Sequence, residues 1–286
     1  MIECIQINDE NYVNHLGVSV DGKPVGYGLI PRNYSLNPVG YAEGSKTFDA
    51  VEDMPLIPWE EIPERIAEKD AEESWLDDMR MRGQDGGPIP SLDQNGFPYC
   101  WSFSVTSAAM LLRMSAGLPP VRLCGTANAA MIKNFVQEGG WGALALERGM
   151  SIGIPSVEFW KEKSMSRSND NPATWINAGL HKIGEGWIDL HAAVYDRQLS
   201  AQQSATCLLQ NVPGIFDYPW WSHSVCGVRL LDVHKDRSAR DISRYGIRIW
   251  NSWSDNWGTK GMGDLVDGRA WPGGGVAPRT ITISMQ

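Results

Sequence analysis

The sequence predicts an α+β fold in which a helical half precedes a β half, with an irregular arm at the N-terminus. Apolar residues recur at helical spacing from residue 100 onward. Runs rich in β-branched and aromatic residues follow from residue 187. Residues 1–58 are instead rich in Gly, Pro and Asn, which favour turns and irregular structure. We therefore expect an N-terminal arm at residues 1–87 and one globular domain at residues 88–286.

The arm contains few signals for regular structure. Asp21-Gly22 lies between β-forming residues, so we expect a short hairpin at residues 18–25. Residues 59–82 are acidic and contain good helix formers without a clean apolar stripe, which predicts one or two short helices. A long irregular segment in an ordered protein is usually functional. We expect the arm either to occlude a site in the domain or to wrap the domain or a partner protein.

The helical half is predicted to begin at Cys100. Trp101, Val105 and Leu112 share one face of a helix that would end near Gly117. Further helices are expected at residues 126–139, 141–148, 155–163 and 201–211, and strands are expected at residues 187–195, 212–216, 223–233, 245–250 and 280–285.

Three residues spaced along the domain have the chemistry that a thiol nucleophile needs. Cys100 would become reactive as a thiolate, and an imidazole such as that of His223 can take its proton. The amide of Asn251 can orient the imidazole without adding charge. A helix that begins at Cys100 would also favour the thiolate through its dipole. Gln94 could donate a hydrogen bond to the oxyanion that forms on attack.

The local motifs around these residues resemble those of the papain-like cysteine peptidases. Gln94 lies six positions before Cys100, and Trp101 follows it. His223 opens a run of small and apolar residues, and residues 251–258 read Asn-Ser-Trp-Ser-Asp-Asn-Trp-Gly. The motifs occur in a fixed order, and each has its own internal spacing. The resemblance extends over roughly residues 88–286, about two-thirds of the chain.

The resemblance implies a two-lobed fold with a helical half and an antiparallel β half. It also implies a peptidase that uses a Cys-His-Asn triad on a peptide or protein substrate. Cys100 would attack the peptide carbonyl, and His223 would take and return protons. Asn251 would orient His223, and Gln94 would stabilise the oxyanion.

The resemblance extends to residues that would bind substrate. Gly139 and Gly140 resemble an edge that pairs with the substrate backbone. Trp253 matches a residue that shields the His–Asn hydrogen bond from water. The chain also departs from the family pattern, with Phe97 in place of a disulfide cysteine and Ser222 in place of Asp or Asn. The resemblance therefore does not fix the substrate preference.

Composition excludes several other classes. The net charge of −9 argues against a nucleic-acid surface, and no apolar run is long enough for a membrane span. No zinc-type Cys/His spacing or phosphate loop is present, so we expect no metal or cofactor. The five scattered cysteines and the lack of a signal peptide predict free thiols and a reducing, cytoplasmic location.

Two alternative functions stay open. The chain could be a structural or interaction protein that keeps a papain-like fold and makes assembly contacts through its arm. In this respect it resembles papain-like proteins encoded among the virion genes of tailed bacteriophages, and this resemblance implies a virion-associated location. It could also be an acyl-transfer enzyme, such as a transglutaminase-like enzyme or an amidase. Those enzymes generally use Asp as the third residue, so Asn251 disfavours this alternative.

Overall fold

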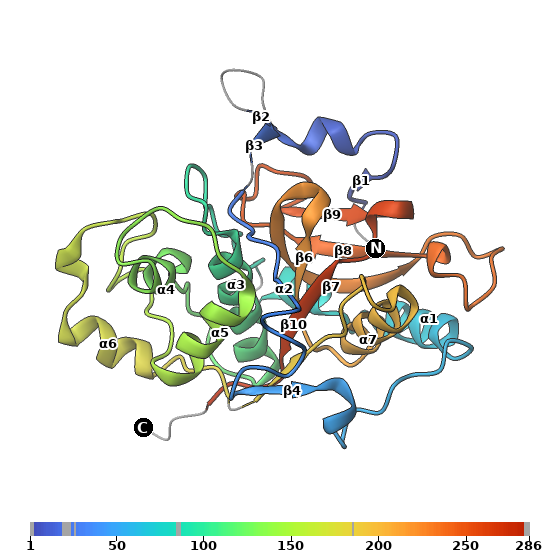
Figure 1. Cartoon of the computed structure of the whole chain (residues 1–286), viewed down its shortest axis with the longest axis horizontal. Helices are drawn as coiled ribbons and strands as arrows, with labels where there is room; N and C mark the ends of the chain where they lie inside the picture. The colour runs from blue at the N-terminus through green and yellow to red at the C-terminus, as the bar shows by residue number, and fades with distance from the viewer. Residues whose placement is uncertain (1–2, 19–23, 26, 84–86, 185, 283–286) are drawn as a thin grey trace.

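The computed structural model describes residues 3–18, 24–25, 27–83, 87–184 and 186–282. Helices gather in one half of the molecule, and a β-sheet makes up most of the other half (Figure 1). The predicted α+β fold with two lobes is confirmed. Within the described part of the chain, no helix has the length and apolar character needed to cross a membrane.

The helical half is built around α3 (Cys100–Ser115), whose side chains are buried from its first residue to Arg113. Burial on all sides suits a helix rich in Ala and Ser, because small side chains let neighbouring elements approach closely. α4 (Gly125–Ile132) and α5 (Gly142–Ser151) pack against α3. α6 (Pro172–Gly179) lies at the outer edge of this half (Figure 1).

A mixed sheet forms the β half. Its eight strands are β1 (Ile5–Ile7), β4 (Ser45–Thr47), β5 (Trp187–Asp189), β6 (Gly214–Tyr218), β7 (His223–Asp232), β8 (Tyr245–Trp250), β9 (Met262–Leu265) and β10 (Gly274–Pro278). The strand order is β1-β9-β8-β7-β6-β10-β5-β4. The strands from β5 to β10 pair antiparallel, whereas β1 and β4 pair in parallel with β9 and β5. Both edges of the sheet therefore come from the arm.

Successive residues of β6 and β7 face two different cores, as the pleat of a strand requires. Ile215 and Cys226 belong to the core shared with α3. Phe216 and Val225 belong to the core shared with α7 (Arg197–Leu209), which lies beyond the sheet from the helical half (Figure 1). The sheet is therefore covered on both faces.

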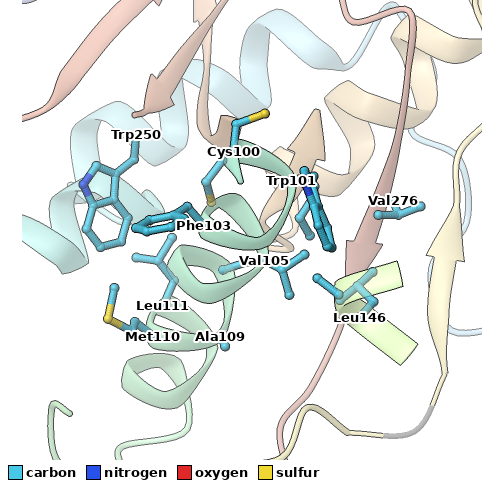
Figure 2. Packing of buried hydrophobic residues seen from close by; sticks show 14 of the residues in the cluster. Cys100, Trp101, Phe103, Val105, Ala109, Met110, Leu111, Leu146, Trp250 and Val276 are labelled. Carbon is cyan, nitrogen blue, oxygen red and sulfur yellow. The ribbon is translucent and has the colours of Figure 1, made fainter. Parts of the chain in front are cut away.

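The interface between the two halves fixes the position of α3. Figure 2 shows Phe103 of α3 beside Trp250 of β8, and Trp101 near Leu146 of α5 and Val276 of β10. These side chains are between 0% and 3% exposed. Full burial of a large apolar side chain contributes about 1.5–3 kcal/mol relative to exposure. The first turn of α3, which carries Cys100, is thus held firmly against the sheet.

Ion pairs hold the two helices of the arm, α1 (Ile62–Glu72) and α2 (Leu76–Arg82), against the β half. Asp77 on α2 accepts hydrogen bonds from Arg229 at 2.8 Å and from Arg248 at 3.2 Å. All three side chains are at most 3% exposed. The sequence predicted one or two short helices here, and the structure has two.

The predicted hairpin in the arm is also present. Gly17–Val18 (β2) pairs antiparallel with Pro24–Val25 (β3). The turn between them lies outside the described residues.

The helix predicted at residues 155–163 is wrong, because this segment forms turns. Two of its backbone groups bond to the segment before α4. Cys124 donates to the carbonyl of Pro155 at 2.8 Å, and Val157 donates to the carbonyl of Arg122 at 3.0 Å.

Other predicted elements differ in their bounds. α4 is shorter than predicted because the backbone turns at Asn134 and Phe135, whose φ angles are +48° and +63°. β5 ends at Asp189, well before the predicted end of that strand. A strand was predicted at residues 280–285, but the last strand of the sheet is β10, which ends before this segment. In the described part of the segment, Ile281 makes only an isolated bridge, and residues 283–285 lie outside the described part of the chain.

Candidate active site

Cys100 is the first residue of α3, and its side chain has no solvent exposure. Its thiol lies beside the backbone N–H of Ser224 on β7, and this contact lowers the thiol pKa. Burial acts in the opposite direction with a larger effect, so the pKa of Cys100 lies well above its ordinary value. The loss of solvent therefore outweighs the predicted effect of the helix dipole. Cys100 is a neutral thiol in this conformation.

His223 opens β7, and Asn251 directly follows β8, which places the two side chains at the same end of two neighbouring antiparallel strands. Nε2 of His223 donates a hydrogen bond to Oδ1 of Asn251 at 2.8 Å. The same Oδ1 accepts a bond from the backbone N–H of Ser252 at 2.8 Å, which fixes the orientation of the amide. An amide oxygen can only accept, so the proton of the neutral ring is on Nε2.

The other ring nitrogen of His223 is left as a free base. Nδ1 is buried and has no hydrogen-bond partner among the described residues. Burial lowers the pKa of His223 to about 3, although the bond to Asn251 acts in the opposite direction. The imidazole is therefore neutral near pH 7. His223 directly precedes Ser224 in the chain, and the backbone N–H of Ser224 lies beside the Cys100 thiol.

The side chain of Gln94 is fixed from both ends. Its Oε1 accepts a hydrogen bond from the hydroxyl of Ser252 at 2.6 Å. Its Nε2 donates to the carbonyl of Phe97 at 3.0 Å and to the carbonyl of Tyr27 at 3.1 Å. The group predicted to bind an oxyanion is therefore bonded to a carbonyl of the arm.

Aromatic rings cover the imidazole. Trp253 stacks on His223 with a centroid distance of 4.8 Å and an interplanar angle of 21°. Trp221 meets His223 edge-on at 4.9 Å, and Tyr27 lies 5.0 Å from it. These apolar faces exclude water and account for the lowered pKa of the imidazole.

A strap formed by residues 27–30 of the arm lies across the site. The carbonyl of Ser222 accepts hydrogen bonds from two strap N–H groups, at 3.0 and 3.3 Å. Gly140 donates to a strap carbonyl and accepts from a strap N–H, both at 2.9 Å, in a parallel bridge. Beside it, a Cβ on Gly139 would lie 2.6 Å from a strap carbonyl oxygen. Figure 1 shows the arm running between the two halves beyond β3.

Gly28 brings the strap into close contact with the loop that precedes α3. Its φ is +111°, and a Cβ on it would lie 2.1 Å from the carbonyl oxygen of Pro98. A residue with a side chain would therefore strain the backbone and collide with Pro98. Of the two roles left open for the arm, the structure shows that part of the arm lies over the predicted site.

The sequence did not identify Tyr27 or Ser252 as site residues. Ser252 lies inside the Asn-Ser-Trp stretch, so its position beside Asn251 could have marked it. Tyr27 belongs to an arm without a motif, and only the folded chain brings it near His223.

No protein-family model matches the chain, and no curated protein matches it in sequence. Several solved structures do match. Xylellain, a cysteine protease from Xylella fastidiosa, aligns with a TM-score of 0.56 and 14% identity over 90% of this chain and 97% of its own. Digestive procathepsin L2 from the larval midgut of Tenebrio molitor aligns with a TM-score of 0.53 and 17% identity over 96% of this chain and 87% of its own. A structure related to the mite allergens Blo t 1 and Der p 1 aligns with a TM-score of 0.57 and 12% identity over 96% of this chain and 88% of its own.

At identities between 12% and 17%, these structural matches establish the fold of the chain. Its activity has to be argued from the site. In this architecture Cys100 begins the central helix, His223 begins β7, and Asn251 directly follows the neighbouring strand β8. The chain has the papain-like fold of the cysteine proteases.

Proposed function

We propose that the chain is a papain-like cysteine peptidase that is latent while the strap covers its cleft. The observation that carries this proposal is the state of His223. Its Nε2 is fixed by Asn251, and its Nδ1 is an unpartnered base. His223 also directly precedes Ser224, whose backbone N–H contacts the Cys100 thiol. A base and a thiol held in this way can form the ion pair that makes a cysteine nucleophilic.

The reaction follows once the strap has left and a peptide has replaced it. Nδ1 of His223 takes the thiol proton, and the sulfur of Cys100 adds to the peptide carbonyl. The oxyanion receives a hydrogen bond from Nε2 of Gln94, which the strap carbonyl has vacated. The amine then leaves with the proton of the imidazolium, and water hydrolyses the thioester with His223 acting as base.

The strap would also control the ionisation of the pair. In the covered state, burial raises the pKa of Cys100 and lowers the pKa of His223, so proton transfer between them is unfavourable. Both shifts arise from desolvation and would decrease when water enters the cleft. The dipole of α3 would then favour the thiolate, as the sequence predicts.

The test compares the wild-type chain with Gly28→Val, because a side chain at this position cannot pass Pro98. We expect the variant to hydrolyse fluorogenic peptides and to react faster at Cys100 with a peptidyl electrophile, as followed by mass spectrometry. Adding Cys100→Ala should abolish both signals. Gly179→Val is the matched control, since a Cβ there meets open space, and it should behave as wild type.

A folded Gly28→Val protein that neither cleaves peptides nor becomes labelled at Cys100 would contradict the proposal. It would favour a second candidate, a structural or interaction protein that uses the papain-like fold. The complete burial of Cys100, His223 and Asn251 is the observation that supports this alternative. Contacts of the arm with other proteins and a virion location stay predictions, which the oligomeric state and fractionation of the native source would test.

A further inference from the structure

Arg32, two residues beyond the strap, fills a pocket of one acidic and three aromatic side chains. Its Nη1 and Nη2 donate to Oδ1 and Oδ2 of Asp189 on β5, at 2.6 and 2.9 Å. Its guanidinium carbon lies 4.6, 5.1 and 4.9 Å from the ring centroids of Tyr34, Tyr41 and Trp141. The side chains of the ion pair are 3% and 0% exposed. A two-pronged carboxylate beside aromatic faces matches the planar fork of a guanidinium.

Within the described residues, the carboxylate of Asp189 is bonded only to the arm. Its third donor is the backbone N–H of Gly40, at 2.7 Å. Arg32 itself is held further by the carbonyls of Asn37, at 2.7 Å, and Pro38. The globular domain therefore supplies a buried carboxylate, and the arm supplies the donors that bond to it. When the arm leaves, this carboxylate loses those partners, and an unpaired buried carboxylate is costly.

A second carboxyl group, that of Asp217 on β6, lies on the same face of the sheet. Asp217 is paired with Gly274 of β10, and Asp189 is paired with Val276, two residues further along the same strand. Oδ1 of Asp217 is buried and has no hydrogen-bond partner in the described part of the chain. Burial raises the pKa of this carboxyl to about 7, and a hydrogen bond with the side chain of Ser224 and the charge of Arg32 act against this rise.

Opposite Asp217, the sheet presents Gly274, which has no side chain. A Cβ on Gly274 would lie 1.9 Å from the hydroxyl oxygen of Tyr34, so the arm packs directly on this glycine. Tyr34 and Asp217 also interact electrostatically. Burial has the larger effect in raising the pKa of Tyr34, and the charge of Asp217 raises it further. The arm residues therefore fill a space bounded by the two acidic side chains.

The pocket adjoins the residues that contact the strap and Cys100. Trp141 directly follows Gly140, whose main chain binds the strap. Asp217 is paired across the sheet with Ser224, the residue whose N–H lies beside the sulfur of Cys100. The charge of Asp217 also acts to raise the pKa of that thiol, so the two groups are close enough to interact.

We infer that Asp189, Asp217 and Trp141 form a substrate subsite for an arginine side chain, which Arg32 occupies while the strap covers the cleft. This inference rests on the proposed peptidase function. Arginine is favoured over lysine because the pocket presents a carboxylate fork and an aromatic face, whereas an ammonium group has neither the fork nor the plane. An incoming arginine would replace the partners that Asp189 loses when the arm moves.

The first experiment uses the full-length Arg32→Ala variant and ethylguanidinium as the probe. Removal of the arginine should lower the Tm, and millimolar ethylguanidinium should raise the Tm of this variant in a saturable way. Ethylammonium should be weaker, and the wild type, whose pocket is filled, should not respond. Arg65→Ala is the control, since this arginine on α1 is 55% exposed and should give no response. Equal effects of ethylguanidinium on all three proteins would overturn the inference.

The second experiment measures binding without catalysis. Full-length Gly28→Val/Cys100→Ala would be titrated with labelled peptides that carry one arginine or, in the matched peptide, one citrulline, which has nearly the same shape but no charge. We expect the arginine peptide to bind about tenfold more tightly, since charge-assisted bonds are the stronger ones. Asp217→Asn should reduce this preference. Equal affinity for the two peptides, or no binding of either, would overturn the subsite.

The two proposals can fail separately. If Gly28→Val cleaves arginine and citrulline peptides at equal rates, the peptidase stands and the subsite is wrong. If the double variant prefers the arginine peptide but Gly28→Val cleaves nothing, the pocket stands and the peptidase is wrong.

Discussion

At the scale of single residues, hydrogen bonds fix His223 and Gln94, and the side chains of Cys100 and His223 are uncharged. Asn251 and Ser252 fix the imidazole and the side chain of Gln94 by bonds of 2.6–2.8 Å. The thiol and imidazole both lack solvent, and desolvation shifts their pKa values in the directions that oppose proton transfer. In the proposed function these residues supply the base and the thiol, and the covering strap withholds their ionisation.

The burial of His223 predicts a specific pH dependence of stability. Its pKa falls from about 6.5 in the unfolded chain to about 3 in the folded chain, so the unfolded chain binds the proton first on acidification. The contribution of His223 to the free energy of unfolding should thus decrease as the pH falls from about 6.5 toward 3, by up to about 1.4 kcal/mol per pH unit. Urea unfolding of the wild type and His223→Gln between pH 7 and 4 checks this, since other titrating groups are common to both. Parallel curves would show that the imidazole is not buried.

Ser252 should act as a positioning residue for Gln94. Ser252→Ala removes the 2.6 Å bond to Oε1 and leaves a buried acceptor unsatisfied, which costs about 1–3 kcal/mol. In the Gly28→Val background, we expect a lower kcat with little change in KM, because the oxyanion donor loses its fixed orientation. Urea unfolding and steady-state kinetics measure the two effects. Ser115→Ala, an exposed position at the end of α3, is the control. An unchanged kcat would exclude a positioning role.

At the scale of secondary-structure elements, local patterns were sufficient where an element carries its own signal. The helix that begins at Cys100 and the strands that begin at His223 and Tyr245 were predicted because apolar spacing and β-branched runs are local. β9 and the short edge strands were missed because they exist through pairing with distant segments. The residues of β9 carry a glycine and an acidic residue, and they form a strand because β8 lies beside them.

The candidate site shows the same division. The contact between His223 and Asn251 followed from motifs that occur within a few residues. The strap could not be predicted, because Tyr27 and Gly28 show their role only through bonds to residues more than 60 positions away. A sequence pattern can thus identify the chemistry of a site without showing what covers it.

The ion pairs beneath α2 give a prediction about the arm as an element. Asp77→Ala removes the shared acceptor of Arg229 and Arg248 and leaves buried guanidinium groups with one partner fewer. Breaking a buried pair in this way costs about 3–5 kcal/mol. Glu68→Ala, whose pair with Arg65 is more than half exposed on both sides, should change stability by less than about 1 kcal/mol. Urea unfolding compares the two variants, and equal effects would contradict the structural importance of the network.

At the scale of the whole molecule, the arm is built into the fold along its length. Its strands β1 and β4 form both edges of the main sheet, and α2 is fixed by buried charges. The strap lies between these anchors and is held mainly by backbone hydrogen bonds to Ser222 and Gly140. Under the proposed function, exposure of Cys100 therefore requires local opening between two fixed points, with Arg32 as the side chain that must leave its pocket.

Hydrogen exchange can measure this opening in the intact chain. We expect the amides of Leu29 and Ile30, which bond to Ser222 and Gly140, to exchange faster than that of Ile249 in the centre of the sheet, since a short segment can open without global unfolding. Gly28→Val should remove the protection of the strap amides and leave the sheet unchanged. If the strap amides of the wild type exchange only at the rate of global unfolding, the strap does not open in the native protein. Activation would then require cleavage of the arm.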